Sequence, residues 1–137
     1  MKISLTRTVR FQATHRLGKP VWSEAENRAR FGTAADEHGH HYACAVTVTG
    51  PVDPATDTVV DLTTLDRLLD REVRARFEGK ALHRELPEFA AGRSQSTCEA
   101  LAVDLFARIA AGLPPGIGLE RVQVAEDDTL SAECRGP

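Results

Sequence analysis

The most diagnostic segment of this 137-residue chain runs His38-Gly39-His40-His41-Tyr42-Ala43-Cys44-Ala45-Val46-Thr47-Val48. Every second residue from His38 leads through His40 into a mostly apolar series, so the segment alternates as a half-buried β-strand does. His38 and His40 therefore share the buried face of the predicted strand. His41 has the opposite parity and is expected to face solvent or a neighbouring subunit.

A third histidine ends another alternating segment. Counting by twos back from His15 passes mostly apolar residues as far as Ile3, so this side chain also points inward from a strand. A single inward histidine is most often a hydrogen-bonded core residue, but three of them each need buried polar partners. Neutral imidazole is the commonest zinc ligand, and three imidazoles with an open fourth position are typical of a catalytic site. His15, His38 and His40 are thus predicted to bind Zn²⁺.

The composition indicates one globular domain over residues 1–137, because 42% of the residues are hydrophobic and the chain is too short for two ordinary domains. The formal net charge is −3 without a basic run, so nucleic acid is not an expected partner. No segment is apolar enough for a signal peptide or a membrane span, which predicts a cytoplasmic protein without a membrane partner. The three cysteines, Cys44, Cys98 and Cys134, are widely spaced and are expected to be reduced.

Two helices are expected in the second half of the chain. Residues 18–35, which precede the second strand, read as a long polar loop of the kind that often carries function. The apolar residues of 61–77 recur at helical spacing, and the expected buried stripe is Leu62, Leu65, Leu69, Val73 and Phe77. Residues available to cap this helix are Asp61, Thr63 and Thr64. Ser96 and Glu99 have capping-box spacing, so a second helix is expected to begin at Ser96 and to continue to about residue 113.

Two further strands are expected at residues 119–126 and 130–134, which completes an α+β domain with the element order ββααββ. In the first of them Val124 and Glu126 share one face, so a carboxylate stands where an apolar residue is expected. An unpaired buried carboxylate costs several kcal/mol or takes up a proton. Glu126 is therefore predicted to anchor a substrate with paired N–H donors, unless the strand ends at Ala125 and Glu126 is an exposed turn residue.

Several motifs together resemble one enzyme family, and they extend over nearly the whole chain. They are Phe11-Gln12-Ala13-Thr14-His15, Ser23-Glu24-Ala25-Glu26-Asn27-Arg28, Phe31-Gly32, His38-Gly39-His40-His41-Tyr42, Val46-Thr47-Val48-Thr49-Gly50-Pro51-Val52-Asp53-Pro54, Val59-Val60-Asp61-Leu62, Pro87-Glu88-Phe89, Ser96-Thr97-Cys98-Glu99-Ala100-Leu101-Ala102 and Val122-Gln123-Val124-Ala125-Glu126. With this order of elements, the chain resembles the 6-pyruvoyl-tetrahydropterin synthase and 6-carboxytetrahydropterin synthase family.

The resemblance implies a tunnelling fold (T-fold), in which a four-stranded antiparallel sheet carries two helices on one face. Members of the family assemble through sheet edges into trimeric barrels and often hexamers, which implies a homo-oligomer with sites between subunits. The resemblance also implies a small-molecule substrate, zinc bound by the three histidines, and a glutamate, matched by Glu126, that grips a pterin ring. Thr97 and Asp127 lie in or beside the matched motifs and are further candidates for substrate binding.

The sequence departs from the family at positions that transfer protons. The family's proton-abstracting cysteine lies a few residues before the HGH motif, and Ala34 stands where it would align. An Asp-His pair of the family becomes Glu78 and Gly79 in a gapless alignment, and a rival alignment recovers the histidine as His83 but not the aspartate. Asp127 replaces a threonine that follows the family's glutamate. Losing these groups should raise the barrier of the family's reaction by several kcal/mol.

Three functions are compatible with this pattern. The first is a diverged zinc-dependent lyase or cyclase that activates a carbonyl or hydroxyl, for example in a Pictet-Spengler-like cyclisation of specialised metabolism. The second is a pterin-pathway synthase in which a glutamate replaces the cysteine, and the third is a non-catalytic oligomer that binds pterins or other small molecules. The candidate proton carriers for either enzyme are Glu37, Glu78 and His83.

Overall fold

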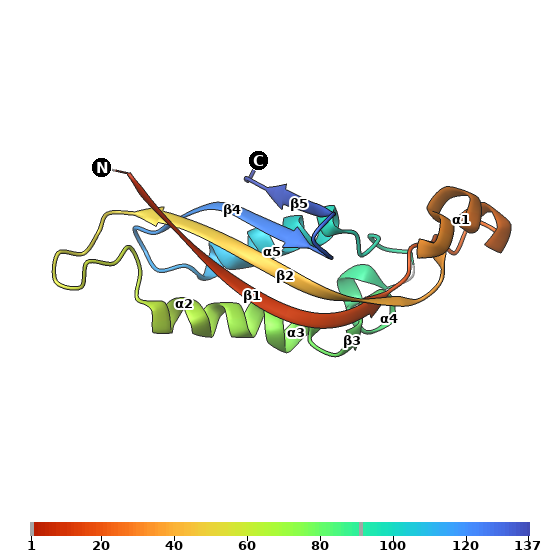
Figure 1. Cartoon of the computed structure of the whole chain (residues 1–137), viewed down its shortest axis with the longest axis horizontal. Coiled ribbons are helices and arrows are strands. Elements are labelled where there is room, and N and C mark those ends of the chain that lie inside the picture. Colours follow the sequence, from red (N-terminus) through yellow and green to blue (C-terminus); the bar gives the residue numbers. More distant parts are fainter. Residues whose placement is uncertain (1, 91) are drawn as a thin grey trace.

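The computed structural model describes residues 2–90 and 92–137, and Figure 1 shows how their helices and strands are arranged. The strands are β1 (Ile3–His15), β2 (His38–Gly50), β3 (Lys80–Ala81), β4 (Gly118–Ala125) and β5 (Ser131–Cys134). The helices are α1 (Glu24–Phe31), α2 (Leu62–Leu69), α3 (Ala75–Phe77), α4 (Leu82–Glu85) and α5 (Cys98–Gly112), with a π-helical segment, Asp70–Arg74, between α2 and α3. Within the described ranges, no helix has the length and apolar character that crossing a membrane requires.

The five strands form one sheet in the order β3-β1-β2-β4-β5. β1, β2, β4 and β5 are antiparallel neighbours, whereas the two-residue β3 pairs in parallel with the end of β1. The segment from α2 to α3 and the helix α5 lie on one side of this sheet (Figure 1). The α+β class and the antiparallel sheet with helices on one face are therefore confirmed, and β3 is a small addition at one edge.

The core lies between the sheet and the helices. The inward residues of β1 and β2 alternate with more exposed ones, and the buried positions include Val9, Phe11, Ala13, His15, Tyr42, Cys44, Val46 and Val48. From the helices, the buried side chains include Leu65, Leu69, Val73, Phe77, Leu101, Leu105 and Ile109. Burial of this apolar surface is the main favourable contribution to folding. Most of the helical stripe predicted from residues 61–77 is thus confirmed.

The helices α2 and α5 each begin at a capping side chain. Asp61 caps α2, because its Oδ2 atom accepts a hydrogen bond from the backbone N–H three residues later at 3.0 Å. Thr97 caps α5, because its Oγ1 atom accepts a hydrogen bond from the Ala100 N–H at 3.1 Å. The prediction that Ser96 caps this helix is wrong, since the carbonyl oxygen and hydroxyl of Ser96 lie against the ring of His15.

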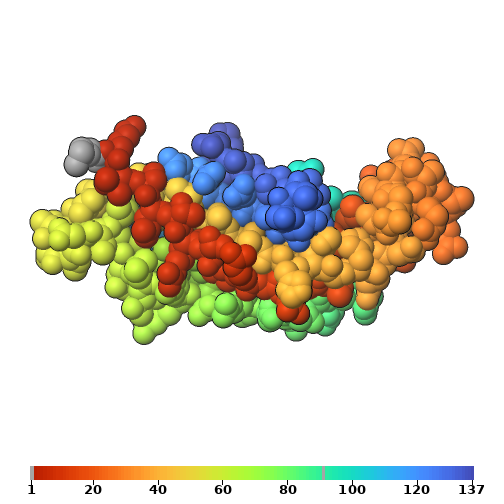
Figure 2. Space-filling model, in the orientation of Figure 1, coloured from red at the N-terminus to blue at the C-terminus, as the bar shows by residue number. Residues whose placement is uncertain are grey.

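The connection at residues 18–35 was expected to be a loop, and the structure corrects this expectation. It contains the helix α1, which is capped by Ser23 through a 3.1 Å hydrogen bond from the Glu26 N–H to the serine Oγ. No residue of α1 is buried, so the helix lacks the apolar stripe by which a helix is recognised in a sequence. In the space-filling view this segment projects from one end of the molecule (Figure 2).

The first turn of α2 offers a matched test of core packing. Leu65 is fully buried, whereas Leu62, which was predicted to belong to the same buried stripe, is 41% exposed because it lies at the first position after the cap. We expect Leu65→Ala to lower the free energy of unfolding by about 2–5 kcal/mol and Leu62→Ala to lower it by less than about 1 kcal/mol, because only the first substitution leaves a core cavity. Urea unfolding followed by circular dichroism measures both values, and equal losses would contradict this difference in packing.

Candidate metal centre

Three imidazoles from two strands converge at one end of the sheet. In the antiparallel register of β1 and β2, His15 lies directly opposite His38, and His40 lies opposite Ala13. The His15 ring centroid is 4.5 Å from that of His38 and 5.1 Å from that of His40. The small side chain of Ala13 leaves room on this face for the imidazole across from it. The predicted common face is therefore observed, and His41 is exposed, as its opposite parity predicts.

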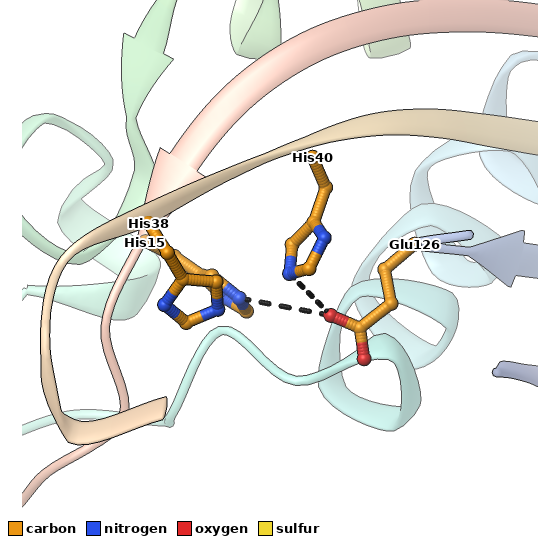
Figure 3. Close-up of side chains that lie close together, drawn as sticks. All are labelled: His15, His38, His40 and Glu126. Carbon is orange, nitrogen blue, oxygen red and sulfur yellow. Dashed lines mark ion pairs between the residues drawn. The ribbon is translucent and has the colours of Figure 1, made fainter. Parts of the chain in front are cut away.

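A carboxylate lies next to these three rings. β4 ends at Ala125, yet the Glu126 side chain is only 15% exposed and points toward the imidazoles (Figure 3). Its Oε2 atom is 2.6 Å from Nε2 of His40 and 3.8 Å from Nε2 of His15. β4 thus ends at Ala125, as one of the two alternatives predicted, but Glu126 is not an exposed turn residue. Its side chain faces inward, as the alternation along the strand predicts.

Backbone carbonyls orient two of the rings. Nδ1 of His15 is 2.8 Å from the Ser96 carbonyl oxygen, and Nδ1 of His38 is 2.7 Å from the Asp36 carbonyl oxygen. Because a carbonyl oxygen only accepts hydrogen bonds, both Nδ1 atoms carry the proton and both Nε2 atoms present lone pairs. Burial lowers the pKa of His15 to about 4, so this ring is neutral near pH 7. Neutral imidazoles held in this way are the form that binds metal ions.

The donor atoms fit a divalent transition metal. One ligand atom from each of His15, His38, His40 and Glu126 lies within 4.8 Å of the others. Four ligands about 2.1 Å from a tetrahedral centre are about 3.4 Å apart, a spacing that lies between the separations of 2.6 and 3.8 Å measured for Glu126. Nε2 of His15 and of His40 is buried without a hydrogen-bond partner among the described residues. These residues could therefore hold a metal ion through three nitrogen atoms and one oxygen atom.

Two of the three candidate proton carriers meet near these imidazoles. Glu37 directly precedes His38 at the start of β2, and His83 belongs to the short helix α4. Oε1 of Glu37 is 3.0 Å from Nε2 of His83, and the Arg84 guanidinium is 3.2 Å from the same oxygen. Burial is the main cause that lowers the pKa of His83, and Glu37 opposes it. His83 also contributes to lowering the pKa of His15, so the pair lies within electrostatic reach of the rings.

The third candidate proton carrier, Glu78, is engaged with the backbone at the edge of the sheet. Its Oε2 atom accepts a hydrogen bond from the Gln12 N–H at 2.8 Å, and the Gly79 N–H donates to the Gln12 carbonyl at 2.7 Å. These bonds attach the segment after α3 to β1 just before β3 begins. Among the described residues, no hydrogen bond or ion pair joins the Glu78 carboxylate to the three imidazoles.

The two remaining substrate-binding candidates also bond within the fold. Thr97 caps α5, as described above, directly after the residue that orients His15. Asp127 accepts hydrogen bonds from the N–H and the hydroxyl of Thr129 at 2.7 Å each, and the hydroxyl bond is the main cause that lowers the pKa of Asp127. Asp127 therefore shapes the turn that follows Glu126 and helps to set the position of that carboxylate.

One buried polar residue beside the imidazoles was not identified from the sequence as a site residue. Tyr42 is 1% exposed, and its hydroxyl has no hydrogen-bond partner among the described residues. Its ring centroid is 5.4 Å from that of His40, and burial raises the pKa of Tyr42, so the phenol stays protonated. The available signal was parity, because Tyr42 follows His38 and His40 on the same strand face.

Metal content should depend on individual histidines. We expect His38→Ala and His40→Ala each to lose the bound divalent metal, because each change removes one of the converging imidazoles. His41→Ala is the matched control and should keep a full complement of metal, since its ring is exposed outside the cluster. Inductively coupled plasma mass spectrometry of the purified proteins measures the content. Retention of metal by both of the first two variants would contradict the site.

The sequence and the fold of this chain are similar to those of known proteins. The family model for 6-pyruvoyl tetrahydropterin synthase matches residues 4–137. The 6-pyruvoyl tetrahydrobiopterin synthase of Drosophila melanogaster is 35% identical over 97% of this chain and 79% of its own length, and that of Homo sapiens is 35% identical over 96% and 90%. The structure of Caenorhabditis elegans 6-pyruvoyl tetrahydropterin synthase has a TM-score of 0.89 at 26% identity, covering 100% of this chain and 97% of that chain. A Plasmodium vivax 6-pyruvoyltetrahydropterin synthase, mutated from glutamate to alanine at a catalytic residue, shares the fold with a TM-score of 0.65 at 12% identity, covering 98% of this chain and 97% of that chain. The chain therefore belongs to the 6-pyruvoyl tetrahydropterin synthase family.

Proposed function

We propose that this protein is a zinc-dependent lyase of the pterin pathway, in which Glu37 and His83 transfer the protons that a cysteine and an Asp-His pair transfer in its family. The main support is the 3.0 Å contact between Glu37 Oε1 and His83 Nε2, next to the converging imidazoles. Membership of the 6-pyruvoyl tetrahydropterin synthase family supports lyase chemistry on a pterin. A glutamate also serves as a catalytic residue in the Plasmodium vivax enzyme, so a carboxylate is compatible with catalysis on this fold.

Zinc is the metal that we propose for the site, because imidazole and carboxylate are ligands that it favours. His15, His38 and His40 would hold it, and the carbonyl oxygens of Ser96 and Asp36 would keep two of the rings oriented. Bound there, the metal would supply Lewis-acid polarisation of a substrate carbonyl or hydroxyl oxygen.

Glu37 is the residue that we assign to proton abstraction. Its side chain is 43% exposed, so a substrate can reach the carboxylate, whereas His83 is only 13% exposed. The lowered pKa of His83 keeps its ring neutral, with the ring proton on the Nε2 that faces the Glu37 carboxylate and a lone pair on Nδ1. Glu37 would keep the abstracted proton, while the His83 ring would take up a second proton at Nδ1 and pass one from Nε2 to a substrate oxygen. The Arg84 guanidinium contacts the same carboxylate and helps to fix its position.

Glu126 is the residue that we assign to recognition of the substrate ring. The two oxygens of a carboxylate can accept a pair of adjacent N–H groups, which a pterin ring carries. Asp127 would act by holding the turn after Glu126, and Thr97 is the further proposed substrate contact on this side of the site.

We also infer a homo-oligomer, a trimer or a hexamer, whose sites are completed between subunits. Within the described residues, β1 has a strand on its outer side only at Ala13 and Thr14, and β5 pairs only with β4, so the sheet has two open edges. Open edges readily pair with strands of other subunits. Sedimentation velocity measures the assembly, and a monomer at micromolar concentration would contradict it.

A Pictet-Spengler-like cyclisation of an aldehyde with an arylethylamine is the alternative function. It is favoured by Ala34 and Gly79, which carry no proton-transfer group where the family has a cysteine and a histidine. In that reaction the carboxylates of Glu37 and Glu126 would hold the amine. A non-catalytic oligomer that binds pterins is the third possibility, and binding without conversion distinguishes it.

Turnover of dihydroneopterin triphosphate by the zinc-loaded protein tests the proposed function. We expect Glu37→Gln and His83→Ala each to lower kcat by about 10²–10⁴-fold, because general acid–base catalysis contributes a factor of this size. Ala34→Cys and Glu78→Gln are the controls and should keep wild-type turnover, since neither residue belongs to the Glu37–His83 pair. Chromatographic detection of the product measures the rates.

Three results would contradict this function. Equal losses in Glu37→Gln and Glu78→Gln would mean that the effect is not specific to the pair with His83. Cyclisation of an aldehyde with an arylethylamine, without turnover of dihydroneopterin triphosphate, would support the alternative reaction. Binding of pterins without conversion of either substrate would support a non-catalytic oligomer.

A further inference from the structure

We propose that Glu126 is a displaceable ligand: at rest it occupies the fourth position of the metal site, and the N–H donors of the substrate draw it away. The substrate in question is that of the proposed function, on which this inference rests. One carboxylate would then both close the metal site and recognise the ring.

The contacts of Glu126 support its place as a ligand at rest. Its Oε2 atom lies 2.6 Å from Nε2 of His40 and 3.8 Å from Nε2 of His15, and an atom of His38 completes a group of four within 4.8 Å. In Figure 3 the carboxylate points toward the rings and away from its own strand. Within residues 2–90 and 92–137, no arginine or lysine pairs with it.

The distribution of charge among His15, His38, His40 and Glu126 favours a bound cation. The Nδ1 atoms of His15 and His38 donate to carbonyl oxygens, so their Nε2 lone pairs are free to face the carboxylate. The Nε2 lone pairs and the largely buried Glu126 carboxylate lie within 4.8 Å of one another. At such a separation they repel each other unless a positive ion lies between them. A proton shared between His40 and Glu126 would neutralise the repulsion for only two of the four metal-ligating atoms, whereas a divalent cation would interact favourably with all four.

The attachment of Glu126 to the fold explains why it can leave the metal. The histidines belong to paired strands, but Glu126 lies one residue beyond β4, where its N–H donates to the Leu130 carbonyl across a turn. The backbone is held by this bond while the side-chain torsions remain able to change rotamer. Glu126 and His40 are 15% and 18% exposed, so a ring that arrives from solvent can reach both. Its N–H donors would compete with the metal for the same oxygen atoms.

Zinc affinity in the absence of substrate tests the resting state. Zn²⁺ is titrated into the metal-free full chain in competition with a chromophoric chelator. Loss of a residue that only orients a ligand already costs about 10–100-fold in metal affinity, so Glu126→Gln should cost at least about tenfold. Glu120→Gln is the same substitution at an exposed position of β4, outside the group of four donor atoms, and should change the affinity by less than about threefold. Equal zinc affinities for these two variants would overturn the inference.

Coupling between zinc and pterin tests the displacement in the wild-type protein. Pterin without a side chain at carbon 6 is the probe, because it carries the ring N–H donors but no side-chain hydroxyl that could bind the metal. If its donors take Glu126 from the metal, each ligand weakens the binding of the other by the same factor. Quenching of pterin fluorescence should therefore show at least about fivefold tighter binding to the metal-free chain than to the zinc-loaded chain. Equal pterin affinities would overturn the displacement.

The two measurements distinguish a failure of this inference from a failure of the proposed function. If pterin binds neither form of the chain, the pterin substrate is wrong and the displacement is wrong with it, while the zinc affinity of Glu126→Gln still decides the fourth ligand. If Glu126→Gln keeps wild-type zinc affinity and pterin binds the wild-type chain, the proposed function stands and Glu126 is a substrate anchor alone.

Discussion

The register between β1 and β2 is the constraint on which the site depends. It pairs Ile3–His15 with His38–Gly50 over the full length of both strands and thereby sets His15 opposite His38. Because side chains alternate with a period of two, a slip by one residue would turn a whole strand's set of side chains to the other face. The buried apolar residues along the same strands resist such a slip. The packing of the apolar residues further along β1 and β2 therefore fixes the register, and the register fixes the positions of the imidazoles.

Because parity is a local property, the sequence alone predicted much of this arrangement. The inward directions of His15, His38 and His40 follow from counting residues within a strand, and so does the direction of Glu126, although β4 ends one residue before it. Sequence patterns did not predict a helix that contributes no residue to the buried core. The helix α1 buries no residue, so the capping-box spacing of Ser23 and Glu26 marks its start without an apolar stripe to support it.

Other features depend on tertiary contacts that no spacing reveals. Ser96 has the spacing of a helix cap, but its polar atoms face the ring of His15, and Thr97 caps the helix in its place. Glu37 and His83 come from the start of β2 and from α4, and only the folded chain brings them to 3.0 Å. An alignment that looks for an adjacent Asp-His pair finds it broken, whereas the fold forms a carboxylate–imidazole pair from two separate segments.

The turn that follows β4 has a consequence for how the protein can diversify. Strand register fixes the imidazoles, so a mutation that moves them also disturbs the hydrophobic interior. The aim of the Glu126 carboxylate depends instead on exposed residues 127–130, which are tied mainly to one another. Evolution can therefore vary the choice of ring while conserving the metal chemistry. A mutant library confined to these positions would sample new specificities at little cost in folding stability.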